Sequence, residues 1–156
     1  MSTEPVKFVN WGPAVFAGLD RPYTFQQLSE IPDQWHKFGP SIGTLPVQVG
    51  KVAYGISHEM TMEGFAYMSG IEVSGTQGLP EEFAILNLPV QRYAVFVHEG
   101  HVSTLCNTVD GIWQQWLATS GEQVPNPPLM IERCGEGFDP QVGQGDLEVW
   151  VAVKEK

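Results

Sequence analysis

Basic side chains are scarce in this sequence. Eight lysines and arginines stand against eighteen aspartates and glutamates, which gives a formal net charge of −10 over 156 residues. No segment clusters the few basic residues. Phosphate backbones are bound by cationic patches, so this composition argues against direct contact with nucleic acid. A negative field attracts cationic partners and also keeps a protein soluble, and the charge alone does not choose between these two roles.

Cysteine and long hydrophobic runs are also scarce. Cys106 and Cys134 are the two cysteines and have no CxxC spacing, which favours reduced thiols in a cytoplasmic protein over a disulfide framework. No apolar run is long enough to cross a bilayer, and no cationic leader precedes one, so neither a membrane span nor a signal peptide is predicted. We expect a single cytoplasmic domain over residues 1–156.

The segment His98-Glu99-Gly100-His101 superficially suggests a metal or catalytic cluster. Zinc-binding histidines of the HExxH type lie four residues apart on a helix, whereas Gly100 predicts a turn. Cys106 and Cys134 have no local partner that would make a nucleophilic pair. The sequence therefore predicts no metal, no cofactor and no catalytic residue.

Regular structure is predicted most clearly over residues 84–119. Alternating side chains around Tyr93, Val95 and Val97 are typical of a strand over 84–98. After a turn at Gly100, apolar residues recur at helical spacing and predict a helix over 104–119. Its buried face is expected to carry Leu105, Val109, Ile112 and Trp116, and the tryptophans Trp35, Trp113 and Trp116 are assigned to the core.

The same order of elements is predicted twice. The first half has a strand at 7–19, a helix at 30–38 and strands at 52–58 and 62–73, with a polar connection at 21–29. The second half has the strand at 84–98, the helix at 104–119 and strands at 130–134 and 146–154. A loop at 74–82 separates two pseudo-repeats of roughly 6–75 and 83–155. Residues 14–18 (AVFAG) also resemble residues 94–98 (AVFVH).

We therefore predict an α+β fold in which tandem βαββ repeats form an antiparallel sheet, with two helices on one face and a ligand groove on the other. Alternation along the last strand places Leu147, Val149 and Val151 against the helices and points Glu148 and Trp150 away. The groove is expected to combine carboxylates with aromatic and methionine side chains. Its candidate ligand-binding residues are Glu148, Trp150, Glu132, Tyr67, Phe65 and Met130.

Such a surface suits a flat aromatic cation. Each aromatic face contributes about 0.5–2 kcal/mol of cation–π attraction, and a carboxylate in a low-dielectric pocket adds a charge that water screens poorly. Glutamates on strands more often face solvent, however, so the residues alone leave a solvated role for Glu148 and Glu132 open.

Several motifs together resemble the effector-binding domain of AraC-type regulators and the gyrase-inhibitor-like (GyrI-like) proteins. They are Tyr93-Ala94-Val95-Phe96, the H-x-G at 98–100, the L…I-W…W-L helix, Glu132-Arg133, the F-D-P at 138–140 and the last-strand E-x-W at 148–150. The match continues upstream into residues 54–73.

This resemblance implies a small-molecule sensor that binds lipophilic cations, with Glu148 as the binding glutamate and Glu132 as a weaker match. Regulators of the family also carry a helix-turn-helix part, which this chain is not expected to contain. Cys134 and Ala152 stand where relatives often have an aromatic residue and a proline.

The leading hypothesis is a stand-alone, non-enzymatic domain that senses or sequesters small lipophilic cations. Two alternatives remain: a hydrolase of reactive toxins on the same fold, and a gyrase-inhibitor-like protein-interaction module. Expected partners are cationic small molecules, without nucleic acid or membrane, and a protein partner or homodimer is left open.

Overall fold

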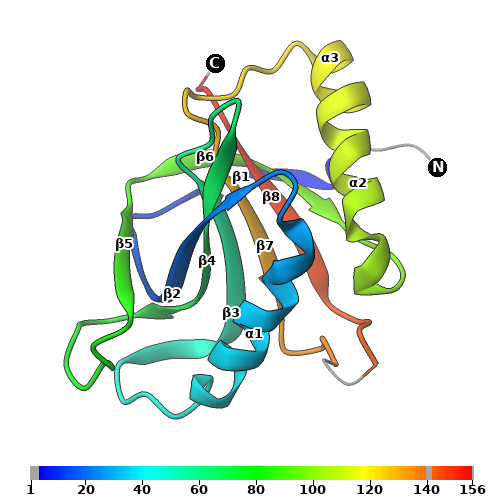
Figure 1. The fold of residues 1–156 in the computed structure, drawn as a ribbon. Coiled ribbons are helices and arrows are strands. Elements are labelled where there is room, and N and C mark those ends of the chain that lie inside the picture. The colour runs from blue at the N-terminus through cyan, green and yellow to red at the C-terminus, as the bar shows by residue number, and fades with distance from the viewer. Residues whose placement is uncertain (1–3, 140–141, 156) are drawn as a thin grey trace.

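A computed structural model describes residues 4–139 and 142–155. Within them, eight strands form one antiparallel sheet in the order β1-β6-β8-β7-β3-β4-β2-β5 (Figure 1). The strands are β1 (Lys7–Trp11), β2 (Ala14–Thr24), β3 (Gln48–His58), β4 (Gly64–Val73), β5 (Ala84–Leu88), β6 (Gln91–Val97), β7 (Met130–Cys134) and β8 (Leu147–Val153). The α-helices are α1 (Ile31–Phe38), α2 (Leu105–Gly111) and α3 (Leu117–Ser120). A π-helical turn, η4 (Ile112–Trp116), joins α2 to α3. Three short 3-10 turns are η1 (Leu28–Glu30), η2 (Gly39–Ser41) and η3 (Val102–Thr104).

The two halves of the chain have the same element order and mirrored places in the sheet. The first half supplies β2, α1, β3 and β4, and the second supplies β6, α2, β7 and β8. Strands β3 and β7 pair at the centre, so the order β6-β8-β7 on one side matches β2-β4-β3 on the other. This arrangement confirms the predicted α+β fold with an antiparallel sheet of βαββ units.

The edge strands are exchanged between the halves. Strand β1 pairs with β6 and not with a strand of its own half, starting from Lys7 opposite Val95. Strand β5 pairs with β2, with Ala14 opposite Leu88. The junctions β1–β2 and β5–β6 approach each other closely, since a methyl group at Gly12 would lie 2.6 Å from the carbonyl oxygen of Pro89.

Both faces of the sheet are buried. On one face, α1 covers a cluster with Phe38 and Ile71, and α2 with η4 covers a second cluster with Ile112 and Val149. The strand registers place these clusters on the same face of the sheet, as Figure 1 also shows for the helices. The expected burial of Leu105, Ile112, Trp116, Val149 and Val151 is confirmed, whereas Val109, also expected to be buried, is only partly buried. The other face is filled by Phe16, Tyr54, Ile56, Met68, Tyr93, Ile131 and Ala152.

Several predicted boundaries are wrong. Each long strand that begins a half is interrupted, the first at Gly12-Pro13 and the second at Pro89-Val90, because proline cannot donate a ladder hydrogen bond. Strand β2 then runs on to Thr24, where a polar connection was expected, because its pairing with β4 continues to Gly64.

The similarity between residues 14–18 and 94–98 does not mark equivalent positions. Phe16 packs in the cluster on the face away from the helices, whereas Phe96 packs beneath α2. The matching side chains therefore point to opposite faces, and the likeness of the halves lies in their topology.

The predicted helix at 104–119 is present, and it ends at Gly121 in the left-handed conformation (φ 78°). No helix in the described part of the chain is long and apolar enough to span a membrane.

Close packing of β2 on β4 gives a test of this register. A methyl group at Gly18 would lie 1.9 Å from the carbonyl oxygen of Ser69 and 2.7 Å from Cα of Gly70. Because these are backbone atoms, Gly18→Ala should lower the free energy of unfolding by about 2–3 kcal/mol, measured by urea denaturation. Gly39→Ala is the control, since no atom lies within 4 Å of its added methyl group; it should cost nothing. Equal stability of the two variants would contradict the register.

Candidate functional site

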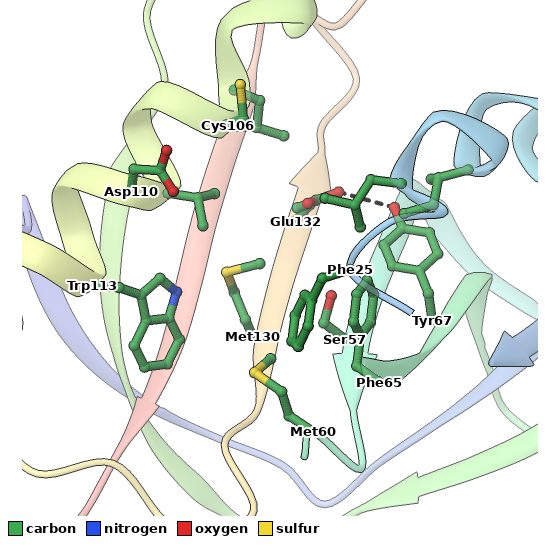
Figure 2. A pocket seen from close by; sticks show the side chains of 14 residues that line it. Phe25, Ser57, Met60, Phe65, Tyr67, Cys106, Asp110, Trp113, Met130 and Glu132 are labelled. Carbon is green, nitrogen blue, oxygen red and sulfur yellow. Dashed lines mark hydrogen bonds between the residues drawn. The ribbon is translucent and has the colours of Figure 1, made fainter. Parts of the chain in front are cut away.

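An apolar pocket lies on the helix-covered face of the sheet, between the two helices. Its volume is about 420 Å³, within the range of small-molecule sites. Strands β3, β4 and β7 form its floor, and α1 and α2 form its walls (Figure 2). The lining residues are Phe25, Leu28, Ile31, Ser57, Met60, Phe65, Tyr67, Leu105, Cys106, Val109, Asp110, Trp113, Met130 and Glu132.

The register of the strands places the side chains of the pocket floor next to one another. Ser57 lies opposite Met130 on one side and opposite Tyr67 on the other. Since side chains alternate along a strand, Glu132 of β7 and Phe65 of β4 point to this same face. Figure 2 shows these side chains converging from two different halves of the chain.

Glu132 and Tyr67 are the central polar pair. The Tyr67 hydroxyl donates a hydrogen bond of 2.9 Å to Oε1 of Glu132, and it accepts one of 3.0 Å from the Trp35 indole N–H. An indole can only donate, so Trp35 occupies an acceptor site of the Tyr67 oxygen and leaves its single proton for Glu132. This chain orients the hydroxyl toward the carboxylate.

Desolvation dominates the electrostatics of the pair. It raises the pKa of Glu132 from 4.5 to about 7, although the hydrogen bond from Tyr67 acts in the opposite direction. Burial also raises the pKa of Tyr67 well above 10, and the nearby Glu132 charge adds to this effect. Tyr67 is therefore a neutral donor near neutral pH, and Glu132 changes its charge there.

Gly55 makes the close approach of the pair possible. It lies on β3 between Tyr67 and Glu132, and an added methyl group would meet the Tyr67 oxygen at 2.1 Å and Oε1 of Glu132 at 2.9 Å. Any side chain at this position would separate the phenol from the carboxylate. A strand was predicted at 52–58, but the sequence offered no signal for this role of Gly55, because only the fold shows that β3 lies between β4 and β7.

Helix α1 is fastened to the floor by a buried glutamine. The Gln34 amide donates to the backbone carbonyl oxygens of Leu19 (2.8 Å) and Tyr67 (3.0 Å), and its Oε1 accepts from the Tyr23 hydroxyl. Gln34 is 1 % exposed. These bonds hold the neighbouring Trp35 against Tyr67.

The six predicted ligand-binding residues do not share one face. Glu132, Tyr67, Phe65 and Met130 line the pocket between the helices. Glu148 and Trp150 lie on the opposite face, because Met130 pairs with Val151 and Glu132 with Val149. The prediction of a single groove that holds both glutamates is wrong, and the apolar pocket that contains Glu132 is on the face with the helices.

Glu148 has a different environment from Glu132. Its Oε1 accepts a hydrogen bond of 3.1 Å from the Trp150 indole and lies 3.5 Å from the Arg133 guanidinium. These residues border a smaller, more polar pocket of about 370 Å³ with Lys7, Trp11, Tyr54 and Glu72. Glu148 is thus already paired with a cation of the protein.

The two tryptophans of the second helical segment lie in different environments. Trp116 packs edge-on against Phe96 in the core, as predicted, but Trp113 lines the pocket. Trp113 lies at the border of the apolar helix stripe, which is the one sequence feature that could have indicated this position.

Burial raises the pKa of the Cys134 thiol to about 12, so that the thiol is not a nucleophile near neutral pH.

The histidine segment has a structural role. Nδ1 of His98 lies 2.7 Å from the Thr108 hydroxyl, and its Nε2 lies 2.9 Å from the carbonyl oxygen of His101. These contacts tie the end of β6 to the start of α2. Over the described residues, no group of three or more His, Cys, Asp or Glu side chains could hold a metal ion.

The raised pKa of Glu132 makes stability depend on pH. Because the native state holds this proton more tightly than the unfolded chain, the favourable contribution is present below about pH 4.5 and is lost as pH rises through about 7. Glu132→Gln keeps an acceptor for Tyr67 and removes the titration. The melting temperature of wild type relative to Glu132→Gln should fall from about pH 5 to about pH 8. A constant difference between the two proteins would contradict this assignment.

Solved structures with this fold include ligand-bound and regulatory proteins. SAV2435, solved bound to tetraphenylphosphonium, has a TM-score of 0.75 and 14% identity over 95% of this chain and 93% of its own. A putative bacterial transcription regulation protein from Staphylococcus aureus has a TM-score of 0.76 and 14% identity over 96% and 97%. An integron cassette protein of Vibrio cholerae gives 0.73 and 14% over 98% of both chains. At this identity the likeness shows the fold.

Sequence comparison identifies the family. The transcriptional regulator BrlR of Pseudomonas aeruginosa is 32% identical over 71 residues, which are 46% of this chain and 26% of that regulator. The chain thus spans about a quarter of the length of this relative. The model of the GyrI-like small molecule binding domain matches residues 4–154. The chain therefore belongs to the family of GyrI-like small molecule binding domains, related to the effector domains of transcription regulators.

Proposed function

We propose that this domain binds small lipophilic cations in the pocket between α1 and α2, as a sensor or a sequestering protein. One observation carries the proposal: the Glu132 carboxylate lies in a largely apolar pocket, and among the described residues no lysine, arginine or histidine lines it. A buried carboxylate without a counter-ion is costly, and a cationic ligand supplies the missing charge.

The remaining lining suits the apolar part of such a ligand. Phe25 and Phe65 lie side by side on one side of the cavity and Trp113 lies on the other (Figure 2). A cation near such an aromatic face is attracted by about 0.5–2 kcal/mol. Met60 and Met130 add flexible, polarisable side chains that adapt to ligands of different shape. These side chains favour the binding of ligands of several shapes over strict selection for one shape.

Relatives support the proposal at the level of chemistry. Tetraphenylphosphonium, bound in the structure of SAV2435, is a lipophilic cation. The match to part of BrlR associates the domain with transcription regulation. We propose that this domain, when a ligand is bound, influences transcription through a separate DNA-binding protein or domain.

A second candidate function is hydrolysis of an electrophilic ligand. It is favoured by the pKa of about 7 for Glu132, a value suited to a general base near neutral pH. In that function Glu132 would take a proton from water, and the neutral Tyr67 hydroxyl would hold the carboxylate in place. Product formation with repeated turnover separates this function from stoichiometric binding.

Charge selectivity tests the binding proposal. Tetraphenylphosphonium and tetraphenylborate have nearly the same shape and opposite charge, so a pocket that recognises cations should bind only the first. Binding is followed by tryptophan quenching. Glu132→Gln should weaken the binding of tetraphenylphosphonium at least about tenfold, because the Coulomb attraction between the cation and a poorly screened carboxylate is lost. Glu148→Gln, on the opposite face, is the matched control and should change the affinity less than about twofold. Equal binding of both ions by wild type would refute cation recognition.

Binding should also depend on pH through Glu132. A cation favours the ionised carboxylate, so its binding releases a proton whenever Glu132 is protonated in the free protein. With a free-state pKa of about 7, the dissociation constant should rise about fivefold from pH 7 to pH 6 and about tenfold more by pH 5. Isothermal titration in buffers of different ionisation enthalpy measures the proton release. Glu132→Gln should show a flat profile, and a wild-type profile equally flat would exclude Glu132 as the recognition group.

A further inference from the structure

The pocket between the helices contains a second carboxylate. Asp110 of α2 lines the wall that faces solvent, while Glu132 of β7 lies at the floor (Figure 2). Asp110 is exposed and Glu132 is partly buried, so the two negative charges mark the mouth and the bottom of one cavity. They come from different structural elements, and apolar lining residues lie around them.

Within the described residues, neither carboxylate is paired with a basic side chain. The ion pairs join His58 to Asp20, Arg92 to Glu122 and Arg133 to Glu148. No lysine or arginine occurs between residues 105 and 120, so the helix that carries Asp110 offers no neighbour of opposite charge. Arg133 points to the other face of the sheet, where it meets Glu148.

Asp110 also has no evident role in building its helix. Acidic residues stabilise helices in the first turn, where they meet free N–H groups and the positive end of the dipole. Asp110 is the sixth residue of α2, and the helical segment continues through η4 to Ser120. Aspartate is an unfavourable residue inside a helix, and here it stands one residue after Val109 and three before Trp113, which both line the cavity.

Resting on the proposed function of the same pocket, we propose that its preferred ligands are hydrophobic dications, with one positive charge against Glu132 and the other against Asp110. Val109, Trp113 and Met130 line the same cavity as the two carboxylates, so the part of the ligand that joins its charges is apolar or aromatic. Asp110 is then the residue that determines selectivity for ligand valence, and Glu132 binds any lipophilic cation.

The two contacts differ in strength and in salt dependence. The Glu132 contact is shielded from water, so it is only weakly screened. The Asp110 contact lies at the surface, where charge pairs are weaker and are screened by salt. The preference for a dication over a monocation is therefore largest at low ionic strength and declines as salt is added.

A matched ligand pair tests the proposal. Decyltrimethylammonium and decamethonium have the same alkyl chain and carry one and two quaternary ammonium groups, and hexamethonium varies the spacing. Isothermal titration of all three with wild type, Asp110→Asn and Glu132→Gln measures the contribution of each carboxylate. Asp33→Asn, which removes an exposed aspartate of α1 that does not line the cavity, is the control for loss of one negative charge.

Asp110→Asn should weaken at least one of the bis-quaternary ligands about tenfold at low salt and leave decyltrimethylammonium within about twofold, because only the second charge loses its partner. Asp33→Asn should affect all ligands equally and by less than about twofold. Thermal unfolding of each variant verifies that the fold is retained.

Two outcomes overturn the inference, and they are distinguishable. In the first outcome, decyltrimethylammonium binds through Glu132, and Asp110→Asn either changes the affinity of every ligand equally or changes none. The pocket is then a site for monocations, and the inference alone fails. If no quaternary ammonium ligand binds wild type, the inference fails together with the proposed function.

Discussion

The hydrogen bond between Tyr67 and Glu132 is the contact on which the candidate site depends. Tyr67 belongs to the first half of the chain and Glu132 to the second, and they meet above Gly55 on a central strand. The pocket floor therefore exists only where β3 pairs with β7. Trp35 and Gln34 extend this contact into α1, so one network fixes the carboxylate, the phenol and one wall of the cavity.

The two glutamates show how environment decides the role of one residue type. Glu148 has Arg133 and Trp150 as partners, so its charge is compensated within the protein. Glu132 has a neutral phenol, and desolvation raises its pKa to about 7. The charge of the first carboxylate is balanced by Arg133, whereas the second is open to a cation or a proton. The resemblance of the last strand to the family pattern pointed to Glu148, whereas the geometry favours Glu132.

Much of the fold could be predicted because it depends on local periodicity. The alternation along β8 correctly assigned Val149 and Val151 to the helix face, and the helical spacing correctly assigned Ile112 and Trp116 to the core. The site depended on register between strands, which a single sequence does not contain. A shift of β7 against β8 by one residue would turn Glu132 and Met130 together to the face that carries Glu148, and the sequence pattern is compatible with both arrangements.

The exchange of β1 and β5 has a consequence for folding. Lys7 pairs with Val95, so the first strand has no partner until the chain has been extended into β6. Closing a loop of that length costs more entropy than closing a hairpin, and pairings so distant in sequence are associated with slow folding. During synthesis, β2, β3 and β4 can pair as soon as they emerge, and β5 can then join β2, whereas β1 must wait until β6 has been made.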